Sequence, residues 1–380
     1  MMKFTILAIP FMRRQGEQVQ LPGRDPKRFQ VMMDKVRDQM VFAEGLGFDG
    51  FCLTEQHMQV EGIEATTNPI LWDMYIAQHT KRMRVGQLGM NLTAMNPIKV
   101  AEDIAMLDHM TGGRAFAGFS RGNTARWTAT MGQHLGISST ESDKSEADRR
   151  NRRALYENWR IVKSLWTDDL TSIDGEFWKV PLPVQWDFAP TKLWGADAVD
   201  SKGILRKVSI TPRPLQTPHP PIYAPFSNSM ETARFWGREG AKMVSFVRAE
   251  KEKFMPIIIE NCIEAAGEVG KDLKPKDVLA IGGMIILGEN ENDSKRYYED
   301  FEELWKIAYD APPYHVPMGR IWSGNRHQVH DDVMGLIEKY QIDEIFVWHH
   351  IGYFGDEREK TALSTFADAV IAPIRKQASA

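Results

Sequence analysis

The chain has 380 residues, of which 43% are hydrophobic and 26% charged, a composition typical of a globular protein with a large core. Its formal net charge of −4 argues against a surface that binds nucleic acid. No apolar run approaches the roughly 20 residues of a membrane span, and Cys52 and Cys262 suggest neither a disulfide framework nor a metal cluster. We therefore expect a cytoplasmic protein with no metal site and no nucleic-acid or membrane partner.

Strand-like and helix-like segments alternate from the start of the chain. Eight apolar runs are typical of strands: 4–9, 51–54, 84–92, 114–119, 221–225, 242–246, 278–287 and 344–348. Helical patterns cover 27–46, 68–80, 97–110, 152–166, 230–239, 253–269, 293–308, 329–340 and 361–374. Repeated strand–helix units imply a parallel sheet, and eight of them imply closure. The predicted fold class is therefore α/β, a (β/α)₈ TIM barrel.

Two long segments interrupt this alternation. Residues 168–220 are rich in Pro, Trp and Asp and have no helical period, and residues 309–325 carry three prolines. Segments of this length in a compact domain are often functional. We predict a single barrel domain over residues 1–380, with both segments inserted at its C-terminal mouth. Five aromatic residues of the first insertion either line a lid or only pin the segment down: Phe177, Trp178, Trp186, Phe188 and Trp194.

Polar side chains gather where the predicted strands end. In a barrel of this type, chemistry is carried at the C-terminal ends of the strands. The residues in question are Thr54, Glu55, Gln56 and His57 after the second strand, Ser120 and Arg121 after the fourth, Ser227, Asn228 and Ser229 after the fifth, and His349 and His350 at the eighth. The sequence therefore predicts a ligand site at this end of the barrel.

Several short motifs, in one order, resemble a known family. The segment Gly47–His57 resembles the Gly-Phe-Asp…Glu-His-His segment of bacterial luciferase alpha chains. Asn68-Pro69, Val85-Gly86 and the segments 96–103 and 107–114 follow, and the turn 119–122 completes the series. The agreement is dense over residues 1–125, returns at 221–246, and is thin over 168–220 and 300–330. The chain thus resembles the bacterial-luciferase-like, flavin-dependent monooxygenases.

The resemblance implies a two-component monooxygenase. Such an enzyme takes reduced FMN from a separate flavin reductase and uses O₂ to hydroxylate a hydrophobic organic substrate or to insert oxygen into it. It also implies a homodimer packed through the helices at 68–80 and 97–110. Two alternatives stay open. One is a deazaflavin-dependent oxidoreductase of the same fold, and the Ser-Arg-Gly turn argues against it. The other is a non-catalytic, luciferase-beta-like flavin-binding subunit, which Gln56 favours and His57 and Arg121 disfavour.

The FMN phosphate requires cations and N–H donors. A guanidinium at a strand end can bind phosphate through two hydrogen bonds, which suits Arg121, with Ser120 beside it. The resemblance places a second phosphate arginine at Arg153, with Arg152 as a competitor. The run 227–229 precedes a helix N-terminus, where free N–H groups favour an anion, although these residues could equally be a simple N-cap.

The third strand contains Leu88, Gly89 and Asn91, which the resemblance places beneath the flavin ring. Family members often have a non-proline cis peptide here, and in this chain the corresponding bond is Leu88–Gly89. The alternative is a trans bond, with Gly89 making room for the flavin.

The family's first acid–base histidine corresponds to Gln56 in this chain. An amide cannot exchange protons near neutral pH, so that role cannot be transferred to Gln56 unchanged. His57 either takes the role or serves structure alone. His349 and His350 are the next candidates, with Trp348 as a pocket wall.

Overall fold

The computed structural model describes all residues except 1, 141, 226–228, 247–248, 313–314 and 380. The chain divides into two compact units. The first unit comprises Met1–Gly89, Phe116–Phe119 and Pro221–Ala380, and the second comprises Met90–Ala115 and Ser120–Pro220.

Eight parallel strands close into a barrel. They are β1 (Lys3–Pro10), β2 (Gly50–Leu53), β3 (Arg84–Gln87), β5 (Ala115–Ser120), β8 (Ile222–Pro225), β9 (Lys242–Ser245), β10 (Leu279–Ile286) and β12 (Glu344–Ile351). Each strand is hydrogen-bonded to the next in this order, and the pairing of β12 with β1 closes the ring. The eight predicted strands are therefore all present, and the predicted (β/α)₈ barrel is confirmed.

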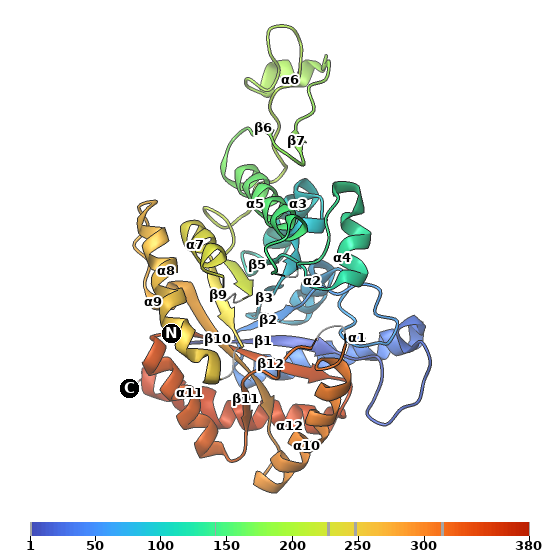
Figure 1. Ribbon diagram of the computed structural model, residues 1–380, viewed down its shortest axis with the longest axis vertical. Coiled ribbons are helices and arrows are strands. Elements are labelled where there is room, and N and C mark those ends of the chain that lie inside the picture. The colour runs from blue at the N-terminus through green and yellow to red at the C-terminus, as the bar shows by residue number, and fades with distance from the viewer. Residues whose placement is uncertain (1, 141, 226–228, 247–248, 313–314, 380) are drawn as a thin grey trace. The chain divides into compact units, whose positions relative to one another are not determined.

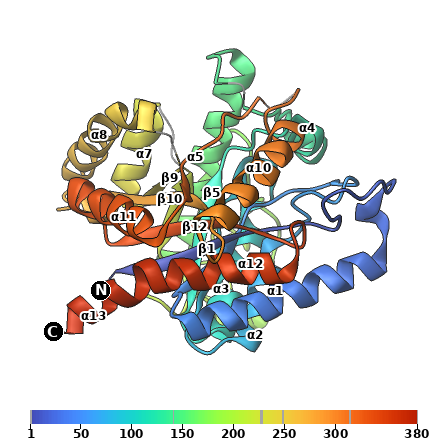
Figure 2. The same ribbon diagram turned by 90° about the horizontal axis from the view of Figure 1, so that it is seen from below.

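Helices surround the strands of the first unit. They are α1 (Pro26–Leu46), α2 (Pro69–His79), α7 (Met230–Glu239), α8 (Met255–Gly267), α9 (Pro275–Val278), α10 (Glu291–Ala308), α11 (Arg326–Tyr340), α12 (Asp356–Phe366) and α13 (Ala372–Ser379). Figure 2 shows α1 and α12 running side by side, where Gln39 donates a hydrogen bond to Glu359. A short ninth strand, β11 (Ile321–Ser323), pairs with β10 inside the segment predicted to be irregular. No described helix has the length and apolarity to cross a bilayer.

The two faces of each barrel strand meet different surroundings. On β12, Phe346 and Trp348 pack with side chains from β1, β2, β5, β8, β9 and β10, a combination that only the barrel interior can bring together. The alternate residues Ile345 and Val347 belong to the core between the strands and the helices. Because this alternation has a period of two, it decides which of two neighbouring residues faces the interior.

A buried charged network occupies the N-terminal end of the barrel. The side chain of Glu344 is fully buried and accepts hydrogen bonds from the hydroxyls of Thr5 (3.1 Å) and Tyr223 (2.8 Å). The cationic groups of Arg84 and Lys242 each lie 3.5 Å from the same carboxylate. All of its oxygens are therefore compensated, as a buried charge requires.

We predict that Glu344→Ala destabilises the protein by about 3–5 kcal/mol, because two partly buried cations lose their carboxylate. Urea denaturation of the wild type and the variant measures this change in the free energy of unfolding. Glu338→Ala, at an exposed position of α11, is the control and should stay within about 0.5 kcal/mol of the wild type. Equal losses in the two variants would contradict the role assigned to the network.

The second unit is mainly helical. It contains β4 (Met90–Asn91), α3 (Pro97–Met110), α4 (Ala125–Gly132), α5 (Glu146–Thr167), the antiparallel pair β6 (Ile173–Asp174) and β7 (Lys179–Val180), and α6 (Ala189–Trp194). Helices α3 and α5 lie side by side (Figure 1) and are joined by a hydrogen bond from the Trp166 indole to the Ala101 carbonyl. Helix α5 begins six residues before its predicted start, because Ser145 caps it. Helix α4 was not predicted.

The first insertion is more ordered than predicted. It contains the β6–β7 hairpin and α6, and Thr171 pairs with Val208 in an isolated bridge. The ring of Phe177 receives the guanidinium of Arg150 at 4.8 Å, which fixes the hairpin to α5. Trp194, in contrast, is 81% exposed, and Phe188 is also exposed. The pinning role thus fits Phe177, whereas a lid formed by the exposed residues stays a prediction.

Candidate active site

The segment after β2 holds an imidazole–carboxylate pair. The Nε2 atom of His57 lies 2.9 Å from Oε1 of Glu55. The Glu55 side chain is 1% exposed and that of His57 is 18% exposed. A buried carboxylate in this position orients the ring through a hydrogen bond, while part of the imidazole stays accessible. The structure therefore gives His57 the partner that an acid–base residue needs.

Gln56 points to different partners from those of His57. Its side chain hydrogen-bonds Glu64, and its Oε1 accepts a hydrogen bond from Gln59 (3.4 Å). Thr54 donates a second hydrogen bond to Glu64 (3.2 Å). The prediction did not include Glu64, because nothing in its local sequence distinguishes it from a solvated loop carboxylate.

The bond between Leu88 and Gly89 is cis, as predicted from the resemblance. A Cβ atom on Gly89 would lie 3.0 Å from backbone atoms of Gly118 and Phe119 on β5. A Cβ on Gly118 would lie 2.0 Å from the Gln87 carbonyl oxygen. The glycines here are therefore required for the close approach of β3 and β5, an explanation for Gly89 that needs no flavin.

In the second unit, the residues predicted near the flavin pack on one another. Asn91 is buried; its amide donates to the Thr128 hydroxyl (3.0 Å) and its carbonyl accepts from Thr93 (2.6 Å). A Cβ atom on Gly122 would lie 2.1 Å from the Asn91 amide nitrogen. The hydroxyl of Ser120 donates to the Met90 carbonyl (3.2 Å). Asn91 and the Ser-Arg-Gly turn thus form one packed group.

Arg121 is held rigidly by α5. Its Nη2 donates to the carbonyl and the carboxylate of Asp148 (2.8 and 2.5 Å), and its Nε donates to Asn151 (3.0 Å). Among the described residues, Nη1 has no hydrogen-bond partner, and 11% of the side chain is exposed. Burial lowers the pKa of Arg121, and Asp148 opposes that effect. Burial would raise the pKa of Asp148, but hydrogen bonds from Thr140 and Arg121 hold it below its usual range.

The structure does not bring Arg153 to Arg121. The Arg153 guanidinium is 43% exposed and pairs with Glu176 (2.8 Å) and Glu146 (3.0 Å). The positive charge of Arg152, one position earlier on α5, acts instead on Arg121 and Asp148 and lowers the pKa of both, after the larger effects of burial and hydrogen bonding. Consecutive helix residues point in directions about 100° apart, which explains why only one of the two faces Arg121.

Of the run 227–229, Ser227 and Asn228 lie outside the described residues. Ser229 accepts a hydrogen bond from the backbone N–H of Thr232 (3.4 Å) and is the N-cap of α7. The N-cap interpretation of Ser229 is therefore confirmed, and anion binding by this run stays a prediction.

The two histidines of β12 differ in their surroundings, and the strand continues past both to Ile351. His349 lies on the helix-facing side, and its Nε2 is 2.8 Å from the Gln39 oxygen. His350 shares the interior face with Trp348, and its Nε2 is buried with no hydrogen-bond partner among the described residues. Burial lowers the pKa of each to about 3, so both are neutral near pH 7. The contacts of His349 support positioning of α1, whereas His350 is the histidine that faces the interior.

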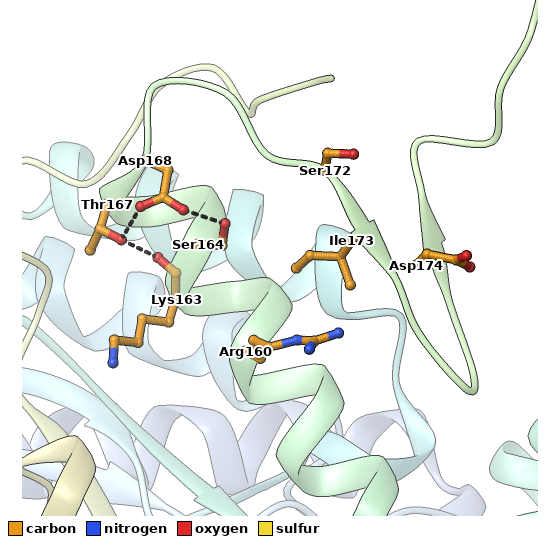
Figure 3. A pocket seen from close by; sticks show the side chains of 8 residues that line it. All are labelled: Arg160, Lys163, Ser164, Thr167, Asp168, Ser172, Ile173 and Asp174. Atoms are coloured by element: carbon orange, nitrogen blue, oxygen red, sulfur yellow. Dashed lines mark hydrogen bonds between the residues drawn. The ribbon is translucent and has the colours of Figure 1, made fainter. Parts of the chain in front are cut away.

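A polar pocket of about 460 Å³ lies on the second unit, at the C-terminal half of α5 and the start of the first insertion. Figure 3 shows that Ser164 and Thr167 direct their hydroxyls to Asp168, while Arg160 lies farther along α5. The hydroxyls of Ser164 and Thr167 are bound to the Asp168 carboxylate, and no residue predicted for the site lines the pocket. This pocket is therefore not a candidate for the active site.

The chain belongs to the luciferase-like monooxygenase family, whose pattern matches residues 2–333. Members of this family are oxidoreductases that use flavin or F420. The predicted family is therefore confirmed. Because members use either flavin or F420, belonging to the family does not decide between these two cofactors.

Individual proteins support the same assignment. The uncharacterised protein YwcH of Bacillus subtilis is 37% identical over 338 residues, which cover 86% of this chain and 91% of that protein. The alkanal monooxygenase alpha chain of Photorhabdus laumondii is 24% identical over 269 residues, 70% of this chain but only 62% of its own length. The oxygenating constituent of 3,6-diketocamphane monooxygenase from Pseudomonas putida, solved with FMN, has the same fold, with a TM-score of 0.67, 17% identity and coverage of 97% and 98%. Other matches are named F420-dependent enzymes.

Proposed function

We propose that this protein is a two-component monooxygenase that uses reduced FMN and O₂ to hydroxylate a hydrophobic organic substrate or to insert oxygen into it. The observation that carries the proposal is the geometry of Arg121. Asp148 and Asn151 fix its guanidinium, while Nη1 keeps its donor capacity. A phosphate group fits this donor, because a cation held in place forms strong, directed hydrogen bonds to phosphate oxygens. FMN ends in such a phosphate.

The same proposal assigns further residues to the binding of FMN. Arg152, which acts on Arg121, is a better second phosphate arginine than Arg153, which is committed to two surface glutamates. Asn91 and Ser120 support the turn that carries Arg121, and the Leu88–Gly89 bond is where the resemblance places the flavin ring. Reduced FMN, when bound, supplies the reaction with O₂. The protein's own residues bind the cofactor and exclude water around it.

His57 is the residue that we propose holds or moves a proton. Its Nε2 is anchored on Glu55, so the ring keeps one orientation at the end of β2. Gln56 cannot take this role, and His349 is turned toward α1. His350 faces the interior, but its lowered pKa keeps it neutral, which suits a hydrogen-bonding role better than proton transfer at neutral pH.

The remaining proposals concern partners and location. We propose a separate flavin reductase, a cytoplasmic location, one domain formed by both units, and a homodimer. For the homodimer, Leu71 on α2 and Met106 and Met110 on α3 are exposed apolar residues, which often mark an interface. Trp72 is buried between Phe29 and Tyr75 and contributes to the core instead.

Isotopically labelled dioxygen tests the proposed reaction. The full chain is incubated with FMN, NADH, a generic flavin reductase and a panel of apolar ketones, aldehydes and aromatic compounds. We expect at least one product that carries one labelled oxygen atom and depends on both the protein and the reductase. Products formed only by hydride transfer, without label, would contradict the proposal.

One alternative keeps a specific observation in its favour. F420-dependent enzymes occur among the similar proteins and structures, so a deazaflavin-dependent oxidoreductase is the second candidate. A non-catalytic, luciferase-beta-like subunit is less favoured, because the Glu55–His57 pair is complete. Unlabelled reduced product with F420 would support the former, and flavin binding without turnover of any substrate would support the latter.

A further inference from the structure

A buried carboxyl, Glu64, lies beside the end of β2 in the first unit. Its side chain is 8% exposed, and its backbone adopts the left-handed conformation, with φ at 48°. Thr54 donates a hydrogen bond to it (3.2 Å), and the side chains of Gln56 and Tyr309 also interact with it. The carboxyl therefore connects the segment after β2 with the residue that follows α10.

No cation compensates this carboxyl. Among the described residues, the groups that act on it are two hydroxyls and one amide, all of them neutral. Burial raises the pKa of Glu64, and the interactions with its polar neighbours only partly offset that effect. Burial without a compensating cation therefore favours the protonated form of Glu64 more than that of an exposed glutamate.

The surroundings place Glu64 next to the interior-facing end of β12. The ring of Tyr309 stacks on Trp305 at 4.5 Å and lies 6.2 Å from Trp348 and 6.4 Å from His350, between ring centroids. Trp348 and His350 are the interior residues of β12 at this end of the barrel. Glu64 thus belongs to the wall where a barrel of this type carries its chemistry.

We propose that Glu64 is a positioning residue that holds a proton behind Gln56 and thereby sets the orientation of the Gln56 amide. This inference rests on the proposed function. When Glu64 is ionised, it accepts a hydrogen bond from the Gln56 amide N–H, and the Gln56 carbonyl stays an acceptor, as its contact with Gln59 shows. When Glu64 is protonated, its O–H donates to the Gln56 carbonyl. The amide then turns and presents its N–H groups instead.

Infrared spectroscopy of the unliganded full chain tests the proton on Glu64 without any turnover. The wild-type minus Glu64→Gln difference spectrum should show the carbonyl stretch of a protonated carboxylic acid that persists above the ordinary glutamate pKa of 4.5. Tyr309→Phe removes a group that lowers the pKa of Glu64, so it should move the loss of this band to still higher pH. Glu338→Gln is the control and should leave the band unchanged. A carbonyl band already lost at pH 4.5, the ordinary pKa of glutamate, would overturn the proposal.

The free energy of unfolding should depend on pH in a way that reports the same proton on Glu64. Because folding raises the pKa of Glu64, its contribution to stability is fully present below the glutamate pKa of the unfolded chain and is lost as pH rises through the folded value. Glu64→Gln, which cannot ionise, should remove this loss. Urea denaturation across that pH window, with Glu338→Gln as the control, measures it. An unchanged pH dependence in Glu64→Gln would contradict the proposal.

The positioning role is tested by the pH profile of turnover with reduced FMN. Glu64→Gln should remove the limb of the profile that reports the ionisation of Glu64, so that turnover no longer changes with pH in that range. In a Gln56→Ala background the same substitution should have no further effect. Additive losses in the double variant would assign Glu64 a purely structural role and overturn the proposal. If no variant turns over, the proposed function fails, and the infrared and stability titrations still decide whether Glu64 holds the proton.

Discussion

Replacing Arg121 with alanine should weaken the binding of reduced FMN and also destabilise the second unit. Losing a charge-assisted contact to phosphate should cost about 1.5–3 kcal/mol, or roughly 10- to 150-fold in affinity. Asp148, whose side chain is 3% exposed, would also lose its cation. Breaking a buried ion pair from one side costs about 3–5 kcal/mol of folding free energy. Flavin titration and urea denaturation measure the two effects separately.

A second variant separates binding from folding. Arg121→Ala combined with Asp148→Asn removes both charges, while the asparagine can still accept a hydrogen bond from Thr140, which donates to Asp148 at 2.8 Å. This double variant should recover much of the stability lost in Arg121→Ala but none of the affinity. If it bound reduced FMN as tightly as the wild type, the assignment of Arg121 to the phosphate would be wrong.

Replacing His57 with alanine should lower product formation by roughly 10²–10⁴-fold, the usual range for loss of acid–base assistance. Binding of reduced FMN should stay intact, because the phosphate contacts proposed above lie on other residues. The physical reason is the pair with Glu55, which holds the imidazole in one orientation. Turnover at saturating flavin, compared with flavin affinity measured separately, checks both parts of this expectation.

Three matched variants define the role of His57. His57→Gln should restore little activity if the ring transfers a proton, and much more if it only donates a hydrogen bond. Glu55→Gln keeps the contact but removes the carboxylate charge, so it should lower activity less than His57→Ala does. Gln56→His rebuilds the paired histidines that the family carries. Full coupled turnover in His57→Ala would place the proton chemistry elsewhere, with His350 the next residue to examine.

The fold follows closely from the sequence, because each barrel strand is a short apolar run between turns and helices. Its exceptions have local causes. β11 is only three residues long, and the β6–β7 hairpin has two residues in each strand, so neither shows a measurable periodicity. The predicted third strand, 84–92, is interrupted after Gln87, where the chain passes through the cis bond at Leu88–Gly89.

The site was less accessible to prediction, because its key pairings join distant residues. Arg121 and Asp148 are 27 positions apart, and Asp148 resembles an ordinary acidic residue in the first turn of a helix. Glu64 interacts with Tyr309, although most of the barrel strands lie between them in the sequence. The choice between His349 and His350 depended on which residues of β12 face the barrel interior. That orientation is fixed only when β12 pairs with β1. The cis bond was predicted from the family resemblance and not from the residue types.

An anaerobic titration tests most directly whether the protein binds reduced FMN or reduced F420. The full chain is titrated in turn with reduced FMN and reduced F420, and binding is followed by the absorbance and fluorescence of each cofactor. We expect saturable binding of reduced FMN that weakens in the Arg121→Ala/Asp148→Asn variant, with F420 bound more weakly or not at all. Tight binding of F420 together with no binding of reduced FMN would contradict it.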